Sequence, residues 1–388
     1  MPCRIRCYHY NKAFRVVFDS PQIKRMQADS VIVRIDFDDG TTGFGESAPR
    51  SYVTGEDCHS VVDLIRNRFA PLLFSHTICC LCDVETMLNQ LEKTCQDYEI
   101  SNYLSALGAI DLALIDALER SQRLAPHELF PICCRSDLRF SASIPFLPQS
   151  VIETYFPLLR AHLDIAVLKV LVGEDVEINR ARVKLIRSIA GGDAELRLEF
   201  NGKMSYERVR KNLECLKQFD IRAVEQPLPP HRIDELFQLR DMFNLEFVAD
   251  ESLVSLDDAR ALAPSGPYSI FNIKVSKCGG LLRSKRISAL AHSHGIRCQI
   301  GTHVGESRLL THAGRRLARS IPNFDCYGGG SEVLFSRLFD APASQTAVNP
   351  LSSMEEGRRG REACHRWVSD YPLLMDLRRE TTHSTPCI

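Results

Sequence analysis

Three carboxylates stand at corresponding places in three successive apolar runs of the chain. Glu199, Glu225 and Asp250 each end a short run rich in Leu, Val, Ala or Phe. The carboxyl ends of parallel strands meet at one edge, so these acids converge if the runs are such strands. Any one acid alone would be interpreted as a solvated or salt-bridged loop residue. Converging carboxylates repel unless a cation joins them, and oxygen ligands without imidazole or thiolate suit Mg²⁺ or Mn²⁺. The sequence therefore predicts such a metal site, with positions left open for a substrate carboxylate.

Three basic residues in other apolar runs could move a proton beside this metal. Lys274 shares one strand face with Asn272, and an ammonium near a divalent ion has a lowered pKa, which frees the amine as a general base. Lys169, from an earlier run, could face Lys274 across the cavity. His303 is the third candidate, because imidazole is an acid or base near neutral pH. The alternatives are that Lys274 only neutralises the acids and that His303 is structural.

The elements that would position these residues follow a regular spacing. Beyond about residue 140, β-rich runs alternate with helical segments that carry Arg, Lys and Glu, as in parallel βα units. The runs end near Ser143, Lys169, Glu199, Glu225, Asp250, Lys274, His303 and Asp325. From Lys169 onward these ends lie 22 to 30 residues apart, close to the roughly 25 to 30 residues of one unit in an eightfold barrel. We therefore predict a TIM-type (β/α) barrel.

The segment before the barrel predicts a second, α+β domain. Val31–Phe37 is a predicted strand, and residues 38–40 suit a tight hairpin turn. Residues 103–120 predict an amphipathic helix whose Asp111 and Asp116 take faces away from the core. The predicted domains are an α+β capping domain at 1–135, a modified (β/α)8 barrel with the metal and catalytic site at 136–340, and a C-terminal extension at 341–388 that is partly capping or disordered.

Composition excludes several classes of partner. Among 388 residues, 48 Lys and Arg balance 49 Asp and Glu, and neither sign dominates a long stretch, so we expect neither nucleic acid nor a membrane as partner. The chain lacks an apolar signal and any charge-free run of about 20 residues, which predicts a cytoplasmic protein. Fifteen cysteines are then interpreted as small hydrophobes, and the cluster at residues 79–82 lacks a second pair for zinc.

Motifs along nearly the whole chain resemble the enolase superfamily, in the branch of muconate lactonizing enzymes, mandelate racemases and dipeptide epimerases. In the cap the similar motifs are Asp39-Gly40, Gly43–Glu46, Ala48–Arg50, Val53–Glu56 and Ala109–Asp116. In the barrel they are Ser141–Pro145, the three strands with the acids, Asn272–Gly280 and Gly301–Ser307.

The resemblance implies roles for these residues. Glu199, Glu225 and Asp250 would bind Mg²⁺ with support from Asn201, and Lys274 on the sixth strand would be the acid/base. The metal would hold the substrate carboxylate and stabilise the enolate that forms when the α-proton leaves. Cap loops near Phe18–Gln22 and Tyr52–Gly55 would shape specificity, and relatives of this kind commonly form homo-oligomers. The substrate contacts expected are Tyr52, Thr54, Asp325 and Glu306.

The sequence also departs from the family pattern. The second lysine of the Lys-x-Lys motif on the second strand is Leu171, which argues against a symmetric two-lysine racemase. Glu199 stands where most relatives have Asp, and Asp325 is the only carboxylate of the eighth strand. His303 resembles the seventh-strand histidine of mandelate racemases, although the sixth strand here carries Lys274. After about residue 341 the Gly-rich closing segment of relatives is not recognisable.

These observations predict a metal-dependent lyase or isomerase that removes the α-proton of a small carboxylic acid. With Leu171 apolar, we expect a dehydratase or cycloisomerase in which Lys274 is the base and His303 or Lys169 is the acid. One alternative is a racemase or epimerase of amino-acid derivatives, which requires Lys169 to serve as the second base. Another is a catalytically silent relative that binds a carboxylate.

Overall fold

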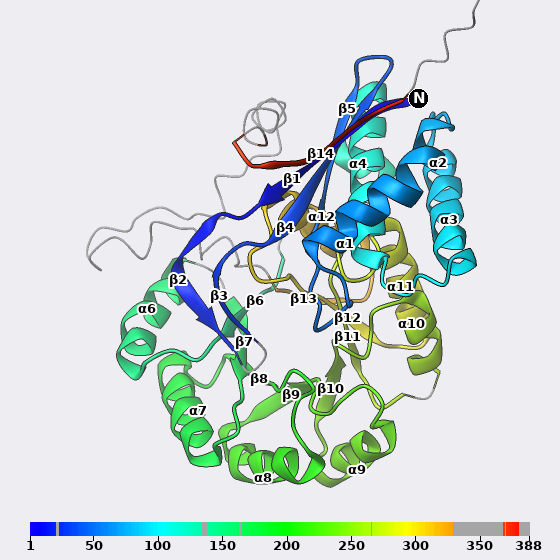
Figure 1. The fold of residues 1–388 in the computed structure, drawn as a ribbon. Helices are drawn as coiled ribbons and strands as arrows, with labels where there is room; N and C mark the ends of the chain where they lie inside the picture. Colours follow the sequence, from blue (N-terminus) through cyan, green and yellow to red (C-terminus); the bar gives the residue numbers. More distant parts are fainter. Residues whose placement is uncertain are drawn as a thin grey trace, which may run out of the picture.

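The protein combines a closed barrel with a smaller cap that lies over one side of it (Figure 1). The computed structural model describes residues 1–20, 23–133, 138–162, 165–264, 266–328, 368 and 370–379. Within these residues no helix has the length and apolar character needed to cross a membrane.

The barrel consists of eight parallel strands in sequential order, with β13 closing on β6. Its strands are β6 (Phe140–Ile144), β7 (Ile165–Leu171), β8 (Glu195–Glu199), β9 (Ile221–Glu225), β10 (Glu246–Ala249), β11 (Ile270–Ile273), β12 (Arg297–Ile300) and β13 (Phe324–Tyr327). The connecting helices are α6 (Gln149–His162), α7 (Val176–Ala190), α8 (Tyr206–Leu216) with the 3₁₀ turn Lys217–Phe219, α9 (Ile233–Phe243), α10 (Leu256–Leu262), α11 (Leu281–Ser293) and α12 (Arg308–Ser320). The predicted TIM-type barrel and its eight strands are thereby confirmed.

The cap is built on an antiparallel sheet in the order β14-β1-β4-β5. Its strands are β1 (Pro2–Tyr10), β4 (Ser30–Phe37), β5 (Thr42–Ser47) and β14 (Leu373–Arg378), and β2 (Ala13–Asp19) pairs with β3 (Lys24–Gln27) in a separate hairpin. Its helices are α1 (Cys58–Leu64), the π-helical turn Ile65–Phe69, α2 (Ala70–Phe74), α3 (Leu81–Asp97), α4 (Leu104–Gln122) and α5 (Pro126–Leu129). The strand and turn predicted at residues 31–40 are the β4–β5 hairpin.

The chain returns to the cap after completing the barrel. Strand β14 pairs antiparallel with β1, with Arg4 opposite Arg378, and Figure 1 shows the two lying along each other. This strand lies inside the segment predicted as a C-terminal extension. Residues 341–367, 369 and 380–388 of that segment lie outside the described residues, as do residues 21 and 22 of the predicted specificity loop.

Helix α4 is buried on nearly every side, so the amphipathic pattern predicted for it is wrong in one respect. Asp111 is fully buried rather than turned away from the core. Its carboxylate accepts a hydrogen bond from the backbone N–H of Leu281, at 2.5 Å, and so caps the start of α11. Gly280 lies against this carboxylate with φ of +103°, and a Cβ there would lie 2.4 Å from Asp111 Oδ2. Burial raises the pKa of Asp111 to about 7.

A second buried carboxylate of the cap binds the next barrel helix. Glu46, on β5, accepts hydrogen bonds from the backbone N–H of Ser307, at 2.9 Å, and from the hydroxyls of Ser307 and Ser30. Burial raises the pKa of Glu46. Because Ser307 precedes α12, the cap contacts the loops that lead into α11 and α12, at the mouth of the barrel. The β2–β3 hairpin reaches the same mouth, where Phe146 donates its N–H to Asp19.

Replacing Asp111 with alanine should destabilise the fold, because the buried N–H of Leu281 would lose its acceptor. The expected loss is about 1–3 kcal/mol of the free energy of unfolding, measured by urea denaturation. Asp111→Asn keeps an acceptor oxygen and should lose less, and Asp97→Ala, at an exposed carboxylate of α3, should be neutral. Equal stability of the Asp111→Ala protein and the parent would show that this contact does not hold cap and barrel together.

Candidate active site

Three carboxylates meet at the carboxyl ends of β8, β9 and β10. Glu199 and Glu225 are the last residues of their strands, they are paired in the ladder, and Asp250 directly follows β10. Carboxylate oxygens of all three lie within 4.8 Å of one another, and each side chain is buried. The strand alternation that turns these residues inward therefore concentrates three acidic groups in a space shielded from water.

Glu225 has the most crowded surroundings of the three. Lys169 Nζ lies 3.1 Å from both of its carboxylate oxygens, and the side-chain amides of Asn272 and Gln299 donate to Oε1 and Oε2 at 2.8 and 3.0 Å. Lys169 Nζ also lies 3.5 Å from Glu199 Oε2. Lys169 is thus drawn to the carboxylate side of the barrel mouth.

Asp250 lies between two lysines. Lys274 Nζ is 2.6 Å from Oδ2, and Lys277 Nζ is 2.7 Å from Oδ1. Burial opposes the charge of Asp250, but the two ammonium groups hold its pKa well below the usual range. Burial likewise opposes the charge of Lys274, yet Asp250 raises the pKa of this lysine. The lowered pKa expected for Lys274 is therefore not a property of the side chains alone; it requires a cation on the carboxylates.

Glu199 shows that the site suits such a cation. Its Oε2 is buried and accepts no hydrogen bond from the described residues, although Lys169 lies near. Its Oε1 accepts from the amide of Asn201 at 3.1 Å. Burial raises the pKa of Glu199, as expected for an acid whose charge is incompletely balanced. An all-oxygen donor set of this kind fits a hard divalent ion.

The two sides of the barrel mouth differ in chemistry. In the ring of eight strands, β7 and β11 stand four places apart and face each other. Lys274 follows β11, whereas the last residue of β7 is the buried Leu171, paired with Glu199. His303 follows β12, the neighbour of β11, so it belongs to the side of Lys274. Both ring nitrogens of His303 are buried without a hydrogen-bond partner among the described residues, and burial lowers its pKa well below the usual value.

The residues predicted to contact substrate fall in several places. Asp325 does not belong to the group of three converging carboxylates. Its Oδ2 pairs with Arg197 at 2.6 Å and its Oδ1 pairs with Arg297 at 2.7 Å. Glu306 is buried and accepts the backbone N–H of His303, and burial raises the pKa of Glu306 to about 8. On the cap, Thr54 is buried and Tyr52 is half-buried.

Sequence reasoning missed three polar residues of the site. Lys277 contacts Asp250, and Gln299 contacts Glu225. Glu251 is half-buried beside the carboxylates, where desolvation and the charge of Asp250 raise its pKa to about 7. The sequence did contain a signal for Gln299, because it is a polar residue flanked by Cys298 and Ile300 in the predicted strand. It contained none for Lys277, because Lys277 lies in the turn beyond β11.

Both parts of the chain match known family models. Residues 15–130 match the mandelate racemase/muconate lactonizing enzyme N-terminal domain, and residues 159–344 match the enolase C-terminal domain-like model. An L-Lys-D/L-Arg epimerase of Methylococcus capsulatus is 30% identical over 331 residues, covering 82% of this chain and 86% of its own. A hydrophobic dipeptide epimerase of Enterococcus faecalis is 29% identical over 303 residues, covering 76% and 80%.

Solved structures agree with these matches. The dipeptide epimerase from Enterococcus faecalis in complex with Mg and L-Leu-L-Tyr superposes with a TM-score of 0.73 and 26% identity, over 84% of this chain and 90% of its own. The N-succinyl Arg/Lys racemase from Bacillus cereus has a TM-score of 0.77 at 22% identity, over 86% and 88%. The chain belongs to the mandelate racemase/muconate lactonizing enzyme branch of the enolase superfamily, whose members are isomerases and related enzymes that use a divalent metal.

Proposed function

We propose that this protein is a Mg²⁺-dependent isomerase or lyase that removes the α-proton of a small carboxylic acid from one face only, with Lys274 as the base. The observation that carries the proposal is the asymmetry of the barrel mouth. A lysine on β11 adjoins the carboxylates, and the facing end of β7 offers the apolar Leu171. Cycloisomerisation or elimination needs only one base, so it suits such a site.

The metal would be held by Glu199, Glu225 and Asp250, with Mn²⁺ as the substitute for Mg²⁺. When bound, such an ion supplies positive charge that attracts the substrate carboxylate. It also offsets the negative charge of Asp250, which keeps Lys274 protonated. Asn201 orients Glu199 through its amide, and Asn272 and Gln299 fix the oxygens of Glu225. These contacts limit the motion of the ligands, which favours a defined position for the substrate.

His303 would act on the same side as Lys274. Neither nitrogen of its neutral imidazole has a hydrogen-bond partner among the residues that the structure describes, so it can donate a hydrogen bond to a leaving group or a product atom. Lys169 is poorly placed to act as the second base, because it already pairs with Glu225 and Glu199. Its role in this proposal is to balance the charge of those carboxylates.

Epimerisation of dipeptides or of other amino-acid derivatives is the second candidate. The relatives described above that act on such compounds favour it. An epimerase must deliver a proton to the face opposite Lys274, so Lys169 would have to leave its carboxylate partners. The two candidates therefore differ in whether α-proton exchange is accompanied by inversion.

The metal site is tested by Glu225→Gln. The substitution removes one negative charge while keeping the side-chain shape, so we expect loss of Mg²⁺ and Mn²⁺ binding and of turnover. Calorimetric titration of chelator-treated protein measures the binding. Glu246→Gln changes a carboxylate at the opposite end of a barrel strand, where Glu246 pairs with Arg297, and should leave ion binding intact. Normal ion binding by the Glu225→Gln protein would refute the assignment.

The base is tested by Lys274→Ala. This variant should still bind the ion, but exchange of substrate α-protons with deuterated water should fall by about 10²- to 10⁴-fold. Nuclear magnetic resonance of a panel of dipeptides, N-succinyl amino acids and hydroxy acids measures the exchange. Lys184→Ala, at an exposed position of α7, is the matched control. Retained exchange in the Lys274→Ala protein would assign the base elsewhere.

The one-face mechanism is tested by Leu171→Lys. The parent protein should exchange the α-proton of one enantiomer with retention of configuration, whereas the variant places a second amine on the facing strand and should gain inversion. Chiral chromatography of the recovered substrate separates the outcomes. Leu171→Met conserves volume and should behave like the parent. Rapid inversion by the parent protein would instead establish the epimerase.

A further inference from the structure

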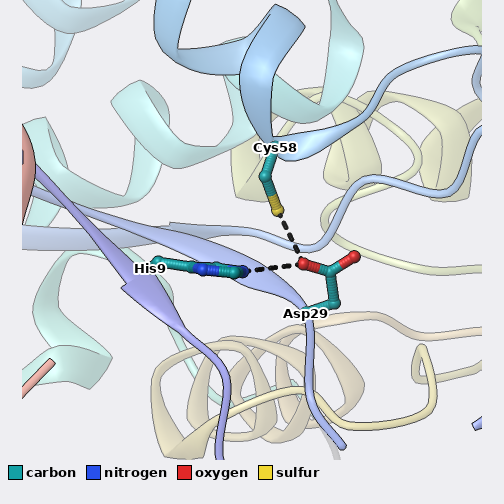
Figure 2. A group of neighbouring side chains, drawn as sticks. All are labelled: His9, Asp29 and Cys58. Atoms are coloured by element: carbon teal, nitrogen blue, oxygen red, sulfur yellow. Dashed lines mark hydrogen bonds and ion pairs between the residues drawn. The ribbon is translucent and has the colours of Figure 1, made fainter. Parts of the chain in front are cut away.

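A second group of metal-ligand side chains lies in the cap, outside the site described above. His9 comes from β1, Asp29 from the turn before β4, and Cys58 from the first residue of α1. Figure 2 shows the three side chains pointing toward one another from these separate segments. A nitrogen, an oxygen and a sulfur of this group all lie within 4.8 Å of one another.

The contacts within the group converge on a single atom. His9 Nε2 lies 2.8 Å from Asp29 Oδ1, and Cys58 Sγ lies 3.2 Å from the same oxygen. Zn²⁺ bonds of about 2.0–2.3 Å place neighbouring tetrahedral ligands roughly 3–4 Å apart, so small rotations of these side chains would surround an ion. The main-chain oxygen of Asp29 accepts a hydrogen bond from Arg50 at 2.9 Å, which fixes the backbone that carries the carboxylate.

The ligand types differ from those of the barrel site. The barrel offers only carboxylates, whereas this group combines a thiol, an imidazole and one carboxylate. Thiolate and imidazole select zinc and similar borderline ions over Mg²⁺. The side chains of His9 and Asp29 are 28% and 45% exposed, so an ion can reach them from solvent.

A nucleophilic role for Cys58 fits the surroundings poorly. Burial and the neighbouring Asp29 raise the pKa of the Cys58 thiol, so the free thiolate is scarce. A reactive cysteine needs the opposite surroundings. The thiol and the imidazole instead meet at one carboxylate oxygen, so three groups of metal-ligand type already face a common point.

We propose that His9, Asp29 and Cys58 form a binding site for one zinc-class divalent ion, with the remaining coordination position open to water. The ion would replace the thiol proton, so that a sulfur–metal bond forms and one proton leaves to solvent. It would tie β1, the turn before β4 and the start of α1 together. This site stands apart from the proposed catalysis and does not depend on it.

Cobalt(II) is the probe, because thiolate ligation gives it a charge-transfer absorption in the near ultraviolet. The whole protein, freed of metals by a chelator, with its thiols kept reduced by a phosphine, is titrated with Co²⁺ in excess Mg²⁺. We expect the thiolate band to saturate at one Co²⁺ per chain, with release of one proton. Zn²⁺ added afterwards should displace Co²⁺ and abolish the band.

Three variants assign the band. Cys58→Ser should remove it, and His9→Ala should weaken Co²⁺ binding by at least about tenfold. Joint replacement of Cys79 and Cys82 by serine removes exposed thiols of another cluster and should leave the band unchanged. Circular dichroism checks that each variant is folded.

Two results would overturn the inference: the parent protein gives no band, or the band survives in Cys58→Ser and disappears with Cys79 and Cys82. Failure of the proposed catalytic function is distinguishable, since Glu225→Gln should lose Mg²⁺ binding and keep the cobalt band.

Discussion

The mutual repulsion of three buried carboxylates is the constraint on which the site depends. Glu199, Glu225 and Asp250 converge where water is excluded, and like charges in such surroundings cannot coexist without compensation. Part of it comes from lysines of two segments, Lys169 on β7 and Lys274 with Lys277 after β11. The closed ring of strands brings these segments together, so the charge balance at the mouth depends on the strand order of the barrel.

The compensation of the carboxylate charges is uneven around the ring. Lys169 stands on the strand that faces Lys274, but its amine is committed to Glu225 and Glu199. The next inward position of that strand is the apolar Leu171, whereas His303 adds a neutral imidazole beside Lys274. Lys274 and His303 therefore lie on one side of the mouth, whereas the facing strand ends in an apolar residue.

Local sequence patterns predicted the barrel because each strand is a short β-rich run followed by polar residues, repeated at a nearly constant interval. They placed the three acids for the same reason. Such local patterns could not predict contacts between residues that lie far apart in the sequence. Asp111 is buried because a backbone N–H of α11 needs an acceptor, and Asp325 is occupied because arginines of β8 and β12 reach it. Hydrophobic periodicity predicts which face of an element a residue occupies, but it does not predict which distant residue will contact it there.

Strand β14 gives the cap an unusual dependence on the order of synthesis. The edge of β1 that it covers is made first, and the covering strand follows the entire barrel in the chain. While the polypeptide emerges from the ribosome, this edge keeps unpaired N–H and C=O groups, the feature by which sheets join foreign strands. The cap can therefore complete its sheet only after translation has passed residue 378, and until then its outer edge stays open to pairing with other strands.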